Sequence, residues 1–251
     1  MGVYGVALAG NMGDFMWSED NSRNFIERGK IFTPARDEIQ EVILNLIPAE
    51  PNEAFLAVEI GIGGGWLAEA LLDRFPESRV LGLDGSSTML QASADRLRRF
   101  GDRVELRHFA LEDRAWRSSF SENVRCFVSS LVIHHLNAEG KQTLYADLYG
   151  SLHDGGGVVI ADLVAPISEW ERRFLATAWD AEVRRQSLAL TGTLDTYQEF
   201  LDQQWNWYIY PDPFDKPSTV SEHLDWLTKA GFGGADVFWA KAGHVIYGGC
   251  K

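Results

Sequence analysis

Along most of the chain, short apolar runs alternate with segments whose apolar residues have helical spacing. Apolar runs bounded by turn residues predict buried strands at residues 58–60, 79–84, 104–108, 124–130 and 158–163. Apolar residues three and four positions apart predict helices at residues 34–46, 67–72, 87–100 and 138–152. Because strands that alternate with helices form parallel sheets covered on both faces, the pattern indicates an α/β fold.

The alternation changes at the end of the chain. A helical pattern over residues 218–230 precedes two strand patterns, at residues 235–239 and 244–248, which only four residues separate. A parallel crossover needs a dozen or more residues, so these two strands must pair antiparallel. We therefore expect a mostly parallel sheet closed by an antiparallel hairpin.

The first predicted strand runs into a glycine-rich turn that is headed by a carboxylate. Glu59 is followed at every second position by a glycine, at Gly61, Gly63 and Gly65. Glycines allow a sharp turn and a close approach of the backbone to a ligand. With the helix behind it and the next strand, which ends at Asp84, this segment describes a nucleotide-binding β-α-β unit.

The glycine spacing argues against two other nucleotide sites. A dinucleotide fingerprint would need a glycine at position 66 or 68, where the chain has Trp66 and Ala68. No Lys-Ser or Lys-Thr pair follows the glycines, so a P-loop is excluded. A purely structural alternative remains open, in which the glycines form a tight connection and Glu59 and Asp84 are ordinary polar ends of strands.

The spacing acid-x-Gly-x-Gly-x-Gly resembles motif I of the class I S-adenosylmethionine (SAM)-dependent methyltransferases. Two more segments, residues 128–136 ending in His-His-Leu and residues 152–157 ending in three glycines, resemble motifs of the broad UbiE-like group of small-molecule methyltransferases. The resemblance covers roughly residues 52–165 and 218–251. It implies an α/β, Rossmann-like class I methyltransferase sheet of seven strands with an antiparallel C-terminal hairpin.

The resemblance also implies a division of the chain. Residues 1–51 are expected to form an N-terminal helical cap, and residues 166–217 a helical lid inserted on the substrate side. Residues 52–165 would form the SAM-binding core, which residues 218–251 complete with a helix and the β-hairpin.

SAM is the cofactor, and S-adenosylhomocysteine the product, that the resemblance implies. Glu59 is expected to interact with the ammonium group of SAM, and the two oxygens of Asp84 with both ribose hydroxyls. The family often has Gly-Asp after the third strand, but here Phe109 and Ala110 would cover the adenine, and Glu112 or Asp113 would supply the polar contact. The predicted cofactor-binding residues are Glu59, Gly61, Gly63, Gly65, Asp84, Gly85, Phe109, Ala110 and Ser130.

A general base is needed only if the acceptor must lose a proton, since the sulfonium already makes its methyl group electrophilic. His134, His135 and Asp162 follow or end predicted strands at the expected position of the methyl group. On an extended segment adjacent side chains point opposite ways, so at most one of the two histidines is expected to face the cavity. Alternatively, the histidine pair only hydrogen-bonds the loop. Asp162 has no obvious oxygen ligands around it, so we expect no metal.

The two segments outside the resemblance are rich in aromatic residues. Both could cover the carboxyl ends of the strands, where open α/β sheets bind ligands. Aromatic side chains there would exclude water and contact a small, partly apolar acceptor, or they would only fasten the extra helices to the domain. The predicted acceptor-binding residues are Phe15, Trp17, Trp205, Trp207 and Tyr208.

Charge and composition limit the classes of partner that the protein can bind. The chain has 36 acidic residues against 23 basic ones, and its net charge of −13 disfavours a nucleic-acid substrate. The arginine cluster at residues 96–107 is interpreted as a solvated face rather than as a binding patch. No long apolar run or export signal is present, and Cys126 and Cys250 form no metal or redox spacing, so we expect a cytoplasmic protein with no membrane segment and with free thiols.

The sequence therefore predicts a SAM-dependent methyltransferase that acts on a small molecule at oxygen, nitrogen, carbon or sulfur. One alternative is a SAM-binding regulatory or partner-binding module without catalysis. Another is a methyltransferase that acts on a protein or on RNA. An apolar N-terminal segment also leaves a homodimer open.

Overall fold

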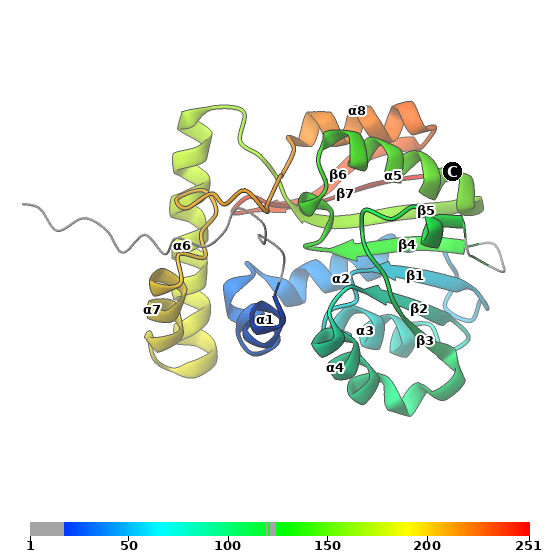
Figure 1. Ribbon diagram of the computed structural model, residues 1–251, viewed down its shortest axis with the longest axis horizontal. Helices are drawn as coiled ribbons and strands as arrows, with labels where there is room; N and C mark the ends of the chain where they lie inside the picture. Colours follow the sequence, from blue (N-terminus) through cyan, green and yellow to red (C-terminus); the bar gives the residue numbers. More distant parts are fainter. Residues whose placement is uncertain (1–17, 119, 121–123) are drawn as a thin grey trace, which may run out of the picture.

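One sheet of seven strands forms the centre of the protein. The structure is a computed structural model that describes residues 18–118, 120 and 124–251. The strand order is β3-β2-β1-β4-β5-β7-β6 (Figure 1). All pairs from β3 to β5 are parallel, and β7 pairs antiparallel with both β5 and β6. The strands are β1 (Leu56–Ile60), β2 (Arg79–Asp84), β3 (Val104–His108), β4 (Val124–Ser130), β5 (Leu152–Leu163), β6 (Gly233–Lys241) and β7 (His244–Cys250).

This sheet confirms the predicted parallel core and its antiparallel C-terminal hairpin. Only Ala242 and Gly243 connect β6 with β7, and both have positive φ, of 51° and 81°. β5 begins at Leu152, several residues before the predicted strand, because pairing with β4 continues past the glycines at 155–157 through a shift in register, where Gly155 has a φ of 79°.

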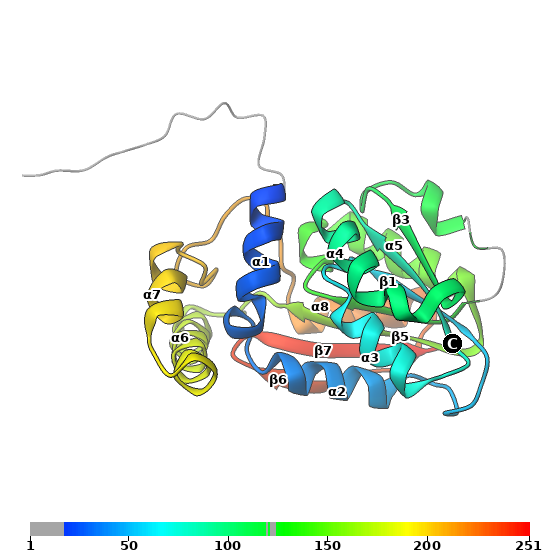
Figure 2. The same ribbon diagram turned by 90° about the horizontal axis from the view of Figure 1, so that it is seen from below.

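Helices cover both faces of the sheet. Alternate strand residues point to opposite faces, so Val58 and Ile60 pack with the helices of one face and Ala57 with those of the other. The first face carries α5 (Ala138–Ser151) and α8 (Val220–Ala230). The second carries α2 (Arg36–Leu46), α3 (Trp66–Arg74) and α4 (Ser87–Leu97), as Figures 1 and 2 show.

Three further helices lie beyond the carboxyl ends of the parallel strands. They are α1 (Glu19–Phe32), α6 (Glu169–Thr191) and α7 (Asp195–Asp202), and Figure 2 shows α1 between the sheet and the α6–α7 pair. A third core cluster, which includes Phe32, Trp179, Val183, Phe200 and Tyr208, holds them together. The apolar pattern of the sequence did not predict α1 as a helix.

Hydrogen bonds from α6 fix the connection between α1 and α2. The ring N–H of Trp179 donates to the carbonyl of Phe32 over 2.8 Å. The amide of Gln186 donates to the carbonyls of Ile31 and Thr33, and its oxygen accepts the N–H of Ala35 over 2.7 Å. The start of α2 is thereby held beside α6.

The predicted helix over residues 87–100 is shorter in the structure. α4 ends at Leu97 and is followed by a 3₁₀ segment, Arg98–Arg103, in which Gly101 has a φ of 53°. Within the described residues, no helix has both the length and the apolar content that a membrane crossing requires.

Candidate functional site

The turn between β1 and α3 is built on three glycines in the left-handed region of backbone conformation. Gly61, Gly63 and Gly65 have φ values of 73°, 53° and 76°. A residue with a Cβ atom adopts such values only with strain, which explains the glycine at every second position. α3 then begins at Trp66, and its N-cap, Gly65, offers no side-chain hydrogen bond. The first N–H groups of α3 are therefore left for other partners at the carboxyl end of β1.

Asp84, the last residue of β2, holds this glycine turn. Its Oδ2 accepts the N–H of Gly63 over 2.8 Å, and its Oδ1 accepts the N–H of Ser86 over 2.9 Å. Burial raises the pKa of Asp84, and these backbone hydrogen bonds oppose that shift. The carboxylate therefore lies at the mouth of the turn, where the sequence predicts a ribose contact.

Glu59 lies one position before the end of β1 and is almost completely buried, with 2% of its surface exposed. Burial raises the pKa of Glu59 well above its usual value, and the nearby charge of Asp84 raises it further, while a backbone hydrogen bond from Ala68 opposes both effects. Its Oε2 has no hydrogen-bond partner among the described residues. A buried carboxylate oxygen without a partner is costly, so this atom is suited to a cationic ligand group.

Arg36 is the first residue of α2, and sequence analysis did not single it out. Its guanidinium lies 5.2 Å from the ring centre of Phe25 and 5.5 Å from that of Trp66. Burial lowers the pKa of Arg36 to about 10, and the charge of Arg96 contributes to this shift. Within the described part of the chain no carboxylate forms an ion pair with Arg36, so its N–H groups are suited to an anionic ligand group.

These side chains line one cleft between the glycine turn and helices α1 and α2. Its volume is about 480 Å³ when the open solvent at its mouth is included. The residues that line it are Phe25, Arg36, Ile39, Gln40, Ile43, Glu59, Gly61, Ile62, Gly63, Trp66, Leu67 and Ser130. The structure thus brings together Glu59, Gly61, Gly63 and Ser130 of the predicted set, and adds Arg36 and Gln40.

The residues predicted to contact the adenine lie in different environments. The N–H of Phe109 donates to the carbonyl of Asp84 over 3.1 Å, and a Cβ atom on Gly85 would lie 3.2 Å from the carbonyl of Phe109. The ring of Phe109, however, is buried edge-on against Trp116, with 5.3 Å between ring centres. Ala110 is exposed beside it. The segment after β3 therefore lies at the right edge, but the Phe109 ring belongs to the core.

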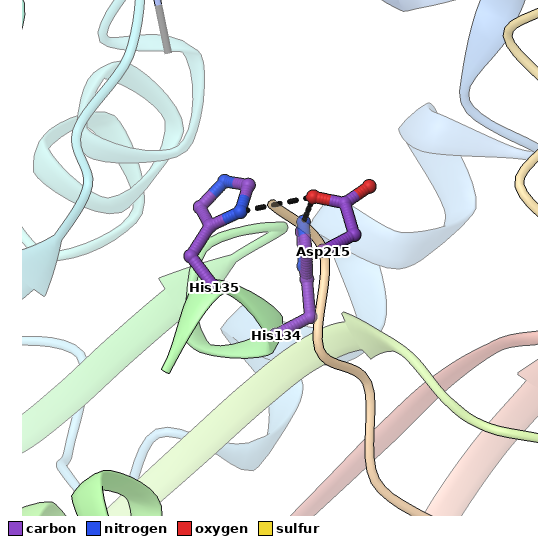
Figure 3. A group of neighbouring side chains, drawn as sticks. All are labelled: His134, His135 and Asp215. Atoms are coloured by element: carbon purple, nitrogen blue, oxygen red, sulfur yellow. Dashed lines mark ion pairs between the residues drawn. The ribbon is translucent and has the colours of Figure 1, made fainter. Parts of the chain in front are cut away.

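His134 and His135 contact the same carboxylate, and the extended segment on which the prediction of a single cavity-facing histidine rested is absent. Residues Ile133–His135 form a 3₁₀ turn after β4 instead of an extended segment, so the two side chains lie side by side. Their ring centres are 4.1 Å apart. Asp215, from the segment between α7 and α8, lies 3.4 Å from His134 Nε2 and 3.0 Å from His135 Nδ1 (Figure 3).

Asp162 completes this group from the end of β5. Its Oδ1 lies 2.5 Å from His134 Nδ1, and both side chains are buried. Burial lowers the pKa of His134, but Asp162 and Asp215 outweigh burial and raise that pKa to about 10. Burial and the charge of His134 lower the pKa of His135. The predicted base candidates His134, His135 and Asp162 therefore form one cluster with Asp215.

The predicted acceptor contacts are distributed over different environments. Tyr208 is buried, and its hydroxyl donates to the carbonyls of Val164 and Gly243 over 2.7 and 3.1 Å, so its role is packing, contrary to the prediction. Trp205 stacks on Phe25, which lines the cleft, with 6.4 Å between ring centres. The ring N–H of Trp207 is buried without a hydrogen-bond partner among the described residues. Phe15 and Trp17 lie outside the described residues.

The structure also tests the arginine cluster. Arg96 pairs with Glu69 over 3.0 Å, and Arg99 pairs with Asp73 over 2.6 Å. Arg103 donates to four carbonyl groups of residues 72–78. These arginines are neutralised by acids or anchor loops, in agreement with the interpretation that they form no patch for a polyanion.

A family model for a methyltransferase domain matches residues 57–156, which contain the glycine turn, Asp84 and the histidine pair. This segment is a class I methyltransferase domain. SAM is the methyl donor of this class. The matched residues extend from β1 through β2, β3 and β4 to the early part of β5.

Solved structures extend the likeness over almost the whole chain. PigF, solved with S-adenosylhomocysteine, is 16% identical, covers 96% of this chain and 64% of its own, and has a TM-score of 0.61. The pyocyanin biosynthetic protein PhzM is 19% identical over 92% of this chain and 58% of its own, also with a TM-score of 0.61. Human N-acetylserotonin methyltransferase in complex with SAM is 13% identical. The likeness covers 93% of this chain and 56% of that protein, with a TM-score of 0.58. At these identities the likeness establishes the methyltransferase fold.

Curated relatives match a shorter segment. Ribosomal RNA small subunit methyltransferase H of Prochlorococcus marinus (strain MIT 9303) is 36% identical over 87 residues, which are 35% of this chain and 28% of that protein. The same enzyme of Parafrankia sp. (strain EAN1pec) is 41% identical over 69 residues, 28% of this chain and 21% of its own. The chain thus matches only about a quarter of the length of these relatives.

The residues of the methyltransferase domain and of α2 fit SAM. The unpartnered Oε2 of Glu59 suits the ammonium group, and the guanidinium of Arg36 suits the carboxylate of the methionine part. The two oxygens of Asp84, at the mouth of the glycine turn, can accept hydrogen bonds from a diol. The sequence did not predict Arg36 because this residue lies outside the segment that carries the motifs. The one sequence signal at Arg36 is its position near the start of a predicted helix.

Proposed function

We propose that the protein transfers the methyl group of SAM to a small-molecule acceptor bound beside the cofactor cleft. The observation that carries this proposal is the cleft itself, which is lined by the glycine turn, by the buried Glu59 and by Arg36, an arginine without an ion pair among the described residues. When SAM is bound, it supplies an electrophilic methyl group on its sulfonium. Glu59, Asp84 and Arg36 bind and orient the cofactor, so that the acceptor can approach in line with the methyl–sulfur bond.

The cluster of His134, His135, Asp162 and Asp215 lies next to this cleft. Val132, one residue before the 3₁₀ turn, packs directly against Gly61 of the glycine turn. In the proposed reaction this cluster receives the acceptor and draws the proton from it. Within the cluster, His135 suits proton acceptance better than His134, because its lowered pKa keeps it neutral near pH 7.

Helices α1, α6 and α7 are proposed to act as cap and lid over the acceptor. They lie beyond the carboxyl ends of the strands (Figure 1), where water exclusion favours methyl transfer. The acceptor-facing candidates are Trp205, which stacks on Phe25, and Trp207, whose ring N–H lacks a partner among the described residues. We further propose a cytoplasmic location, because both cysteines are free thiols.

RNA is a second candidate acceptor, favoured by the likeness to ribosomal RNA small subunit methyltransferase H. Two observations weigh against it. The net charge is −13, and the arginines of residues 96–103 are engaged in ion pairs and carbonyl contacts. A protein that binds RNA normally keeps such cations free for phosphates.

The proposal is tested first by calorimetric titration with SAM and with S-adenosylhomocysteine. The wild type should bind both, and Asp84→Ala should weaken both by at least about tenfold, since hydrogen bonds to a carboxylate contribute about 1.5–3 kcal/mol each. Asp154→Ala, an exposed acid at the opposite end of the sheet, is the matched control. If the wild type binds neither ligand, the proposal is wrong.

A second experiment separates the acceptor classes. Transfer of labelled methyl from SAM is measured with a panel of phenols, amines, thiols and carboxylic acids, and in parallel with ribosomal RNA. Labelling of small molecules alone supports the proposed acceptor class. Labelling of RNA alone would contradict it while leaving the cofactor site intact.

A further inference from the structure

Three side chains with metal-binding atoms converge at the carboxyl end of β4. They are His134, His135 and Asp215, whose candidate ligand atoms all lie within 4.8 Å of one another. Asp215 Oδ1 is 3.4 Å from His134 Nε2 and 3.0 Å from His135 Nδ1. Figure 3 shows both rings turned toward the same carboxylate oxygen. Two imidazoles and one carboxylate thus share a single focal point.

The backbone holds the two contributing segments together. The N–H of Lys216 donates to the carbonyl of His134 over 2.8 Å, and the ammonium of Lys216 donates to the carbonyl of His135 over 3.2 Å. Asp215 is therefore fixed beside the 3₁₀ turn, although it lies about 80 residues later in the sequence. Side chains that are held before a ligand arrives lose less conformational freedom when they bind it.

Asp162 gives His134 the orientation that metal-bound histidines commonly have. Its Oδ1 lies 2.5 Å from His134 Nδ1, so that nitrogen keeps its proton, and a metal ion that displaces the second proton of the ring would bind Nε2 at the focal point. In metal sites the second ring nitrogen of a histidine usually donates to a carboxylate in this way. Asp162 is buried, and its Oδ2 has no other partner among the described residues.

We propose that His134, His135 and Asp215 bind a divalent transition-metal ion such as Zn²⁺, with Asp162 as the positioning residue. Two imidazoles and one carboxylate suit zinc and its transition-metal neighbours, whereas Mg²⁺ and Ca²⁺ prefer oxygen ligands. Three protein ligands leave a coordination position open for water or an acceptor oxygen. The expectation of no metal considered Asp162 alone, because nothing in the sequence joined Asp215 to the histidines.

The site is partly exposed and lies beside the cofactor cleft. The side chains of His135 and Asp215 remain 14% and 20% exposed, and Val132 links their turn to Gly61. A bound ion would use His135 as a ligand, so proton acceptance by His135 and metal binding are alternatives. Metal binding itself does not depend on methyl transfer. It is therefore measured without SAM and without acceptor, so that its failure and the failure of the proposed function remain distinguishable.

The test is calorimetric titration of the full chain, first treated with a chelator, with Zn²⁺ and with Co²⁺. The wild type should bind one ion per chain. Asp215→Ala and His135→Ala should each weaken binding more than about tenfold, and Asp162→Asn by about 10–100-fold, the usual effect of an outer partner. His153→Ala removes an exposed histidine at the other end of the sheet and should bind like the wild type.

Circular dichroism first shows which variants are folded. If the wild type binds no ion saturably, the proposal is overturned, and no variant is needed for that conclusion. If folded Asp215→Ala and His135→Ala bind as tightly as the wild type, the ion lies elsewhere and the proposal is equally overturned. The cluster would then be a network of hydrogen bonds only.

Discussion

Gly61 lies so close to Val132 that a Cβ atom on the glycine would be 2.1 Å from Cγ2 of the valine. The same glycine has a φ of 73°. Gly61→Ala therefore combines a steric overlap, about 1–3 kcal/mol, with the strain of a left-handed alanine, about 1–2 kcal/mol. We expect urea unfolding to show a loss of about 2–5 kcal/mol and SAM binding to weaken.

Gly101 provides the matched control for this substitution. It also has a positive φ, of 53°, but a Cβ atom there would meet nothing within 4 Å. Gly101→Ala should therefore show only the backbone strain, and Val132→Ala should recover part of the loss in Gly61→Ala. Equal losses for both glycine substitutions would show that contact with Val132 does not matter.

Arg36 should contribute to SAM binding through the methionine part of the ligand alone. Replacement by methionine keeps the packing against Phe25 and Trp66 but removes the charge. We expect SAM to bind about 10–100-fold more weakly, since a hydrogen bond to a charged group contributes about 1.5–3 kcal/mol. Binding of 5′-methylthioadenosine, which lacks the amino-acid group, should stay unchanged in the same titration.

Arg98→Met serves as the control for Arg36→Met, because Arg98 is an exposed arginine directly after α4 that pairs with Asp95. It should bind both ligands like the wild type. If Arg36→Met weakens the binding of methylthioadenosine as strongly as the binding of SAM, then Arg36 only shapes the cleft and does not bind the carboxylate of SAM.

The sequence predicted the parts of the site that lie close together along the chain. Glu59, the three glycines and Asp84 belong to one β-α-β unit, whose local geometry requires those residue types at that spacing. The sheet could be predicted for a similar reason, because a short connection forces β6 and β7 to pair antiparallel.

The remaining parts depend on contacts between segments that are distant in sequence. Arg36 reaches the cleft because Gln186 and Trp179 of α6 hold the start of α2. Asp215 reaches the histidines because its segment is tied to their turn by Lys216. No periodicity reports such tertiary contacts, and the 3₁₀ turn that aligns His134 with His135 also lacked a local signal.

Tyr208 should affect stability rather than acceptor binding. Its buried hydroxyl donates to the carbonyls of Val164 and Gly243, which join β5 to the β6–β7 connection. Tyr208→Phe leaves these buried carbonyls with one partner fewer, and we expect a loss of about 1–3 kcal/mol in urea unfolding. Tyr210→Phe, at a tyrosine that is 44% exposed, should change little. No loss in Tyr208→Phe would mean that water or other donors replace the hydroxyl.

Glu59 should make the stability of the ligand-free protein depend on pH. Burial raises the pKa of Glu59 well above its ordinary value of 4.5, and the charge of Asp84 raises it further. The folded state therefore holds this proton more tightly than the unfolded state does. The resulting stabilisation is complete below about pH 4.5 and is lost as the pH rises through the folded pKa.

Glu59→Gln removes this one titration and keeps the shape of the side chain. Urea unfolding of both proteins between pH 4.5 and 8 should show that the wild type loses stability relative to Glu59→Gln as the pH rises. Other acids titrate in both proteins and cancel in the difference. A difference that is constant with pH would mean that Glu59 ionises normally in the fold. Saturating SAM should make this stability difference depend less on pH, because the ammonium group of SAM stabilises the ionised carboxylate of Glu59.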